Sequence, residues 1–78
     1  MSAVKELVEY ITKSLADKPD DVHISEIEGE TSLVLEMRVA PEDMGRMIGR
    51  GGRTINAMRS LSRVLGAKMG KKITLEII

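Results

Sequence analysis

The sequence predicts an α+β domain with the element order helix, strand, strand, helix, helix, strand. Three patterns indicate this order: helical spacing of apolar residues near the N-terminus, three stretches that alternate apolar with polar residues, and a glycine-rich break between two helical stretches. The connection between the second and third strands contains two helices, so these strands can pair in parallel, whereas a short turn makes the first pair antiparallel. We therefore expect a three-stranded mixed sheet with three helices on one face.

The first helix is predicted from an apolar stripe near the N-terminus. The stripe has the spacing of three and four residues that places side chains on one helix face, in Val4, Leu7, Val8, Ile11 and Leu15. Ser2 precedes it and suits an N-cap. The helix should end before Pro19, because the residue before a proline disfavours the helical conformation.

Three short strands follow from apolar alternation. Val22 and Ile24 begin the first, and Ile27 breaks its phase, so we expect a bulge or the strand end there. Residues 28–31 are typical of a turn. The second strand covers residues 33–39 and the last covers residues 73–77, each with one apolar face.

The two helices between these strands have clear boundary signals. Pro41, followed by Glu42 and Asp43, is typical of a first helical turn, where carboxylates interact favourably with the helix dipole. This placement accounts for the two acids without a catalytic role, because no nucleophile or base partner is evident nearby. The second of the helices begins near Gly52, ends around residues 66–70, and carries a broad apolar arc of Ile55, Ala57, Met58, Leu61, Val64 and Leu65.

Composition restricts the class of protein. The 78 residues suffice for one domain, and 42% hydrophobic with 31% charged residues is typical of a globular chain. The chain has no cysteine and one histidine, so we expect no metal site and no cofactor. No apolar run reaches the roughly 20 residues of a membrane span, and no secretory signal is evident, so we expect a cytoplasmic protein.

The charge of the chain is divided between its halves. Residues 1–37 hold three lysines and nine acids, a net charge of −6, whereas residues 38–78 hold nine lysines and arginines and three acids, a net charge of +6. This asymmetry favours one basic surface that can meet an anion. The alternative at this point is two solvated surfaces that differ only in charge.

The most informative segment is Gly49-Arg50-Gly51-Gly52, which we call the glycine loop. Glycines permit positive φ and the close approach of another backbone, and the helix that begins here presents unpaired N–H groups. Three arginines within eight residues, Arg46, Arg50 and Arg53, add positive charge, so the loop suits a phosphate. The alternative is a tight turn that needs glycine for its geometry alone. Neither a Walker A loop nor a dinucleotide fingerprint fits these residues.

The segment Ile48-Gly49-Arg50-Gly51-Gly52-Arg53-Thr54-Ile55 resembles the KH-domain signature, an Ile-Gly-x-x-Gly-x-x-Ile core between two helices. The order αββααβ resembles the type II, bacterial arrangement of that fold. The resemblance covers residues 1–78, with a minimal motif at about 32–78, and is therefore closest to the small stand-alone KhpA (YlqC) family. The segment Asp43-Met44-Gly45-Arg46 also looks like that family.

The resemblance implies a non-enzymatic domain that binds single-stranded RNA, as an RNA chaperone or post-transcriptional regulator. It places Gly49, Arg50, Gly51 and Gly52 against the sugar-phosphate backbone, with Arg46, Arg53 and Arg59 as supporting cations. Ile48, Ile55 and Met37 are expected on the groove floor or in the core beneath it. Without aromatic residues for stacking, sequence selection should be modest and binding should weaken steeply with salt. Glu28 and Glu30 should repel a strand passing their turn.

A dimer is the second expectation. The apolar arc of the last helix is wider than one sheet requires, so Met58, Leu61 and Leu65 are candidates for a homodimer interface. The resemblance also implies a heterodimer with a Jag-like (KhpB-type) KH protein. Two alternative functions remain at this point: a protein-interaction or ribosome-associated module, and an enzyme subunit that holds a phosphorylated ligand.

Overall fold

The computed structural model describes residues 2–78. Its helices are α1 (Ala3–Leu15), α2 (Met44–Ile48) and α3 (Arg53–Met69), and its strands are β1 (His23–Glu28), β2 (Ser32–Arg38) and β3 (Lys72–Ile77). Single 3₁₀ turns occupy Pro19–Asp21, Pro41–Asp43 and Arg50–Gly52. The predicted order of helices and strands is confirmed.

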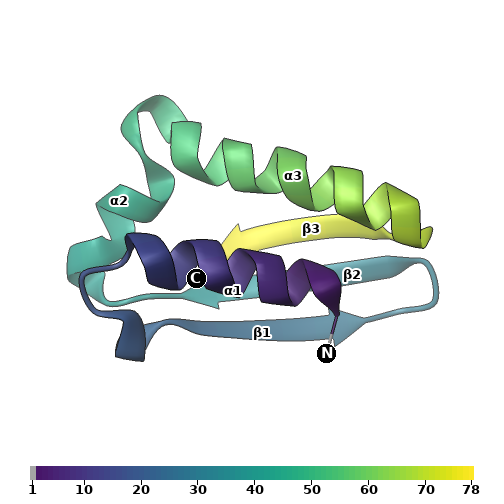
Figure 1. The fold of residues 1–78 in the computed structure, drawn as a ribbon, viewed down its shortest axis with the longest axis horizontal. Helices are drawn as coiled ribbons and strands as arrows, with labels where there is room; N and C mark the ends of the chain where they lie inside the picture. The colour runs from purple at the N-terminus through teal and green to yellow at the C-terminus, as the bar shows by residue number, and fades with distance from the viewer. Residues whose placement is uncertain (1) are drawn as a thin grey trace.

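The three strands form one sheet in the order β1-β2-β3. β1 pairs with β2 antiparallel, and β2 pairs with β3 parallel, as the connections predict. Figure 1 shows α1 and α3 on the same side of the sheet, which leaves the other side without a covering layer. Ile27 lies opposite Val34 in an uninterrupted register, so β1 has no bulge there; the strand ends one residue later, at Glu28, in agreement with the alternative expectation of a strand end.

The core lies between the sheet and the helices. It contains no phenylalanine or tryptophan and is filled with aliphatic and methionine side chains, notably Val4 and Val8 of α1, Leu33, Leu35 and Met37 of β2, and Ile55 and Met58 of α3. Flexible methionines fill the irregular gaps of a core without aromatic rings. The sheet thus presents one buried face to the helices, which fixes the position of α3 above β3.

The N-terminal helix differs from the predicted stripe at two positions, Thr12 and Leu15. Ser2 caps α1 as predicted, with its hydroxyl accepting from the backbone N–H of Lys5 at 3.1 Å. Thr12 is fully buried, and its hydroxyl donates to the carbonyl oxygen of Val8 at 2.7 Å. Leu15, by contrast, is 39% exposed. The helix backbone itself satisfies the buried hydroxyl, so a threonine can occupy a core position that a hydrophobic count overlooks.

The close packing of α3 against β3 depends on Gly66. A Cβ atom at this position would lie 2.2 Å from Cγ1 of Ile73 and 2.9 Å from the carbonyl oxygen of Lys71. The helix continues past Gly66 and ends at Gly70, which adopts the left-handed conformation with φ of 73°. Gly66 therefore serves the approach of β3 to the helix, and Gly70 provides the helix end.

Candidate nucleic-acid interface

The glycine loop forms the corner at which α2 and α3 meet. The N–H of Gly49 donates to the carbonyl oxygen of Gly45 at 2.8 Å, which closes α2. The N–H of Gly52 then donates to the carbonyl oxygen of Gly49 at 3.1 Å, which closes the turn itself. In Figure 1 this corner stands out from the body of the molecule, beyond the end of the sheet.

The glycines of this loop serve different purposes. Gly49 has φ of 78°, and a Cβ atom there would lie 2.4 Å from Oγ1 and 2.7 Å from the backbone N of Thr54. Gly51 has φ of 63°, but a Cβ atom there would have no neighbour within 4 Å. Gly49 is thus required for packing within the protein, whereas Gly51 exposes its backbone to whatever approaches from outside.

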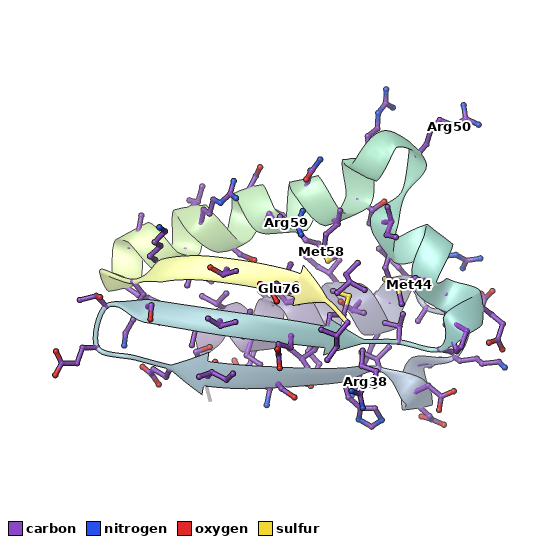
Figure 2. The ribbon with its side chains drawn as sticks, turned by 180° about the vertical axis from the view of Figure 1, so that it is seen from behind. Arg38, Met44, Arg50, Met58, Arg59 and Glu76 are labelled. Atoms are coloured by element: carbon purple, nitrogen blue, oxygen red, sulfur yellow. The ribbon has the colours of Figure 1, made fainter. Side chains whose placement is uncertain are left out.

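Two cations flank the open side of the loop. Arg50 and Arg53 are both exposed, and neither takes part in an ion pair among residues 2–78. Figure 2 shows Arg50 extending away from the protein. Ile48, at the end of α2, is 41% exposed and provides an apolar surface beside them. The exposed backbone at Gly51, the two guanidinium groups without an ion pair and an apolar side chain together suit a ligand that carries both phosphates and bases.

Arg46 lies on the other side of α2 and is already engaged. Its guanidinium donates to both carboxylate oxygens of Asp17, at 2.9 and 3.1 Å, and to the carbonyl oxygen of Leu15 at 3.0 Å. This bidentate pair ties α2 to the end of α1. The structure therefore separates Arg46 from Arg50 and Arg53, with which the sequence groups it.

Asp43 is the buried ionisable group of this region, with 1% exposure. Its carboxylate accepts from the backbone N–H groups of Asp17 and Lys18, each at 3.0 Å. The N–H of Asp17 is the main cause that lowers the pKa of the Asp43 carboxyl, and burial acts in the opposite direction. Glu42 pairs with Lys18, which lowers the pKa of Glu42 and raises that of Lys18. Both acids thus contact the segment after α1; Asp43 makes no side-chain cap to its own helix.

Arg59 connects α3 to the edge of the sheet. Its Nε donates to the carbonyl oxygen of Leu75 in β3 at 3.0 Å, and Nη1 donates to Oδ1 of Asn56 at 3.4 Å. Figure 2 shows the side chain between the helix and this strand. A hollow of about 480 Å³ lies between α3 and β3 and is lined by Arg59, Arg63, Ala67 and residues 71–76. We call it the α3–β3 hollow.

The remaining predicted residues divide between core and surface. Met37 and Ile55 are buried, at 0% and 5% exposure, so both belong to the core and neither is available to contact a ligand directly. Met58 is also buried at 2%, and Leu65 is half-buried against the core. Of the three candidates for a dimer interface only Leu61 is exposed, at 52%. Val64, one turn further along, is 72% exposed.

Sequence reasoning overlooked Arg63 and Lys72, which line the α3–β3 hollow. The signal was present in the spacing, because Arg59, Arg63 and Ala67 recur every four residues and so share one helix face. The pairing of that face with the start of β3 depends on tertiary structure and could not be read from the spacing.

Residues 2–78 contain no group of three or more His, Cys, Asp or Glu side chains placed to hold a metal ion. Within the same residues, no helix has the length and apolar character needed to cross a membrane.

Comparison with known proteins gives close relatives over nearly the full chain. A family model described as "KhpA/KhpB, KH domain" matches residues 5–77. The RNA-binding protein KhpA of Clostridium perfringens is 52% identical over 75 residues, which is 96% of this chain and all of that protein. The RNA-binding protein KhpA of Aquifex aeolicus is 45% identical over 78 residues, covering all of this chain and 99% of that protein.

Solved structures agree on the fold. The crystal structure of Aquifex aeolicus Era bound to GDP and AlF4⁻ superimposes with a TM-score of 0.61 and 18% identity, covering 96% of this chain and 30% of Era. A structure of Era in complex with MgGDPNP and nucleotides 1506–1542 of 16S ribosomal RNA gives a TM-score of 0.62 with 17% identity, over 95% and 29% of the two chains. The predicted KH fold is confirmed.

Proposed function

The chain belongs to the KhpA/KhpB family of KH domains, and from that premise we propose that it binds single-stranded RNA through the glycine loop. The observation that carries the proposal is the open corner at Gly51, where a backbone without side-chain cover lies between Arg50 and Arg53, neither of which forms an ion pair in the described part of the chain. KH domains use such a loop to clamp four nucleotides. The relatives of this chain are named as RNA-binding proteins.

The mode of binding follows from the side chains available. Gly49 to Gly52 contact the sugar-phosphate backbone, Arg50 and Arg53 bind phosphates, and Ile48 contacts a base. Arg59, held by Leu75, stands at the side of the groove. Because the chain has one aromatic residue, Tyr10 on α1, base stacking contributes little and selection among sequences is modest. Such binding suits a chaperone or post-transcriptional regulator of many RNAs.

The proposed function is not enzymatic, and we place it in the cytoplasm, where the protein would meet RNA. The acids that resemble a catalytic pair in the sequence have structural partners. Asp43 accepts from two backbone N–H groups, and Glu42 is paired with Lys18. Both carboxylates are thus engaged by the segment after α1, which accounts for them without a role as a base.

Charge reversal in the loop tests this proposal. Arg50→Asp with Gly51→Asp places carboxylates where phosphates bind, and aspartate tolerates the positive φ of position 51 better than most residues. We expect the affinity for an unstructured RNA oligonucleotide to fall about 100-fold at low salt. The matched control is Lys13→Asp with Ser14→Asp, the same change of charge on exposed positions of α1. Unchanged RNA affinity in the folded loop variant would refute the proposed site.

A second proposal concerns partners: this KH domain pairs with a second copy of itself through α3. Ala57, Leu61 and Val64 are exposed and spaced three and four residues apart, so they form one apolar strip on the free side of the helix. A self-pair would bury this strip and bring two weak RNA sites together, which raises their effective concentration. A KhpB-type KH protein is the heterologous partner that the same strip would fit.

Sedimentation tests the pairing. The wild type should sediment as a dimer at micromolar concentration, and Leu61→Asp should sediment as a folded monomer, because it introduces charge into the centre of the strip. Tyr10→Asp is the control, because Tyr10 is also exposed, at 74%, but lies on α1 and is not part of the strip. A folded wild type that remains monomeric at all concentrations would refute self-pairing.

A further inference from the structure

The face of the sheet that no helix covers has a regular arrangement of side chains, and we call it the outer face. Figure 2 looks onto it, with Arg38 and Glu76 labelled. The registers of both strand pairs place its residues in rows that run across the strands. From one end of the sheet to the other, the rows are His23 and Arg38; Ser25, Glu36 and Glu76; Ile27, Val34 and Thr74; and Ser32 and Lys72.

The acidic row of the outer face is unfavourable within one molecule. Glu36 and Glu76 are direct partners across β2 and β3, and like charges in such positions repel each other. Neither carboxylate forms an ion pair among residues 2–78, and the same holds for Arg38 and Lys72. The outer face therefore holds two carboxylates without a cation, although cations without a carboxylate lie in rows on both sides of them.

An apolar row lies between the carboxylates and Lys72. Ile27 and Val34 are direct partners across β1 and β2, and Ile27 is 58% exposed. The core lies on the other side of the sheet, so the exposed part of Ile27 contributes nothing to it. A small apolar centre with charged groups on both sides has the layout of a protein interface.

A second copy of the chain matches this pattern through a two-fold axis that crosses the strands at Val34. Such an axis places each strand over the same strand of the other copy, in the opposite direction. Positions equally far from the central row then meet. Glu76 and Lys72 lie two residues on either side of Thr74, so each meets the other across the axis. The apolar row meets itself.

The turn between β1 and β2 supplies an outer contact of the same kind. Arg38 follows Val34 by four residues and Glu30 precedes it by four, so both lie about 13 Å from the axis. Glu28, the other acid of this turn, is paired with Lys71 at 2.9 Å. Glu30 forms no ion pair within the described part of the chain and remains available to Arg38 of the second copy.

Two other placements of the axis bring like charges together. An axis along β2 would set Glu36 over Glu36 and Arg38 over Arg38 of the second copy. An axis across the strands at Glu36 would also bring the carboxylates of both copies together. Of these three placements, only the axis at Val34 pairs opposite charges, and electrostatic complementarity selects it.

We propose that the outer face is a self-association surface, on which a second copy of this chain docks about a two-fold axis at Val34. Glu76 pairs with Lys72 of the second copy. Arg38 pairs with Glu30 of the second copy, and the apolar row forms the centre of the contact. This association is separate from RNA binding, because the glycine loop stands beyond the end of the sheet and is left free.

The outer face is small, so this association is weak by itself. Strands of six or seven residues are about 20 Å long and three strands span about 14 Å, which gives a contact of about 300 Å² per copy. Stable complexes bury roughly 800 Å² per partner. The strip on α3 lies in the layer on the other side of the sheet. Pairs joined through α3 can therefore associate further through their sheets.

The test uses Leu61→Asp as background, because this change removes pairing through α3 and leaves the outer face intact. At about 1 mM this variant should self-associate in sedimentation equilibrium, and about 0.5 M salt should weaken the association by screening its ion pairs. Adding either Lys72→Glu or Glu76→Lys should weaken it about tenfold, because like charges then meet across the axis. With both changes together, opposite charges meet again and the association should recover.

The matched controls are Lys13→Glu and Glu6→Lys, made singly in the same background at exposed positions of α1. Both should keep the association. Glu76→Lys also relieves the repulsion from Glu36, so its Tm should not fall and its lost association reflects docking. A Leu61→Asp variant that stays monomeric at about 1 mM would refute the proposed surface. Failure of the combined exchange to restore association, or equal losses in the controls, would refute it too.

Discussion

Two arginines four residues apart, Arg46 and Arg50, have opposite environments in this domain. The guanidinium of Arg46 is held by Asp17 and the carbonyl oxygen of Leu15, on the side of α2 that faces α1. Arg50 extends from the glycine loop without an ion pair among residues 2–78. The anchored side of the α2–α3 corner stabilises the fold, and the open side remains available to a ligand.

The comparison teaches that charge near a binding loop is not sufficient to assign a role. A cation already satisfied by a carboxylate would have to break that pair before it bound a phosphate, whereas an unpaired cation loses only water. The anchored side has a function of its own, because a loop presents its amides reproducibly only when rigid elements hold it. Arg46 and Asp43 supply that support through the segment after α1.

The largest difference in stability between the anchored and the open side should appear when Gly49 and Gly51 are replaced by alanine. Gly49→Ala brings a Cβ atom to 2.4 Å from Oγ1 of Thr54, so we expect a loss of about 3 kcal/mol or more in the free energy of unfolding. Gly51→Ala meets no neighbour and should cost only about 1 kcal/mol for its positive φ. Urea denaturation measures both. Equal losses would contradict the division into a packed and an open glycine.

The next largest effect should come from the buried carboxylate. Asp43→Asn leaves one of two backbone N–H groups without an acceptor, so we expect the Tm to fall by about 10 °C. Glu42→Gln removes only an exposed pair with Lys18 and should change the Tm by about 2 °C or less. Calorimetry measures both variants. A smaller loss for Asp43→Asn than for Glu42→Gln would contradict the assignment of Asp43 as the anchor.

Low pH should weaken the hydrogen bonds that the Asp43 carboxylate accepts. The pKa of Asp43 is lower in the fold than in the unfolded chain, so its contribution to stability is present above the unfolded value, about 4, and is lost as the pH falls through the folded value. The difference in stability between the wild type and Asp43→Asn should therefore shrink as the pH falls below about 4. A difference that stays constant down to pH 2 would show that the charge of Asp43 is not what the fold uses.

The sequence predicts the elements and the loop well, because both depend on local patterns. Helical spacing identifies α1 and α3, alternation identifies the strands, and three glycines between two helices identify the corner. The pairing of Arg46 with Asp17 could not be predicted, since the two residues are 29 positions apart and meet only when α1 packs beside α2. Charge spacing alone therefore grouped Arg46 with the loop.

The buried side of α3 shows a second limit of local patterns. A broad apolar arc does not show which of its residues face the core and which lie at its exposed edge. Met58 and Leu61 were therefore both candidates for the exposed edge. The structure buries Met58 and exposes Leu61, because Ser62 and Gly66 occupy the face toward the core. Small residues there let the helix pack closely, and a search for large apolar side chains overlooks them.

The most direct measurement of the central claim is the salt dependence of RNA binding in Arg50→Gln and Arg46→Gln, which remove the same charge four residues apart. Arg50→Gln should keep the wild-type Tm and reduce the slope of log K against log salt by about 0.7, because one phosphate contact is lost. Arg46→Gln should lower the Tm and keep the slope. Equal slopes in Arg50→Gln and the wild type, with the reduction found in Arg46→Gln instead, would contradict the account.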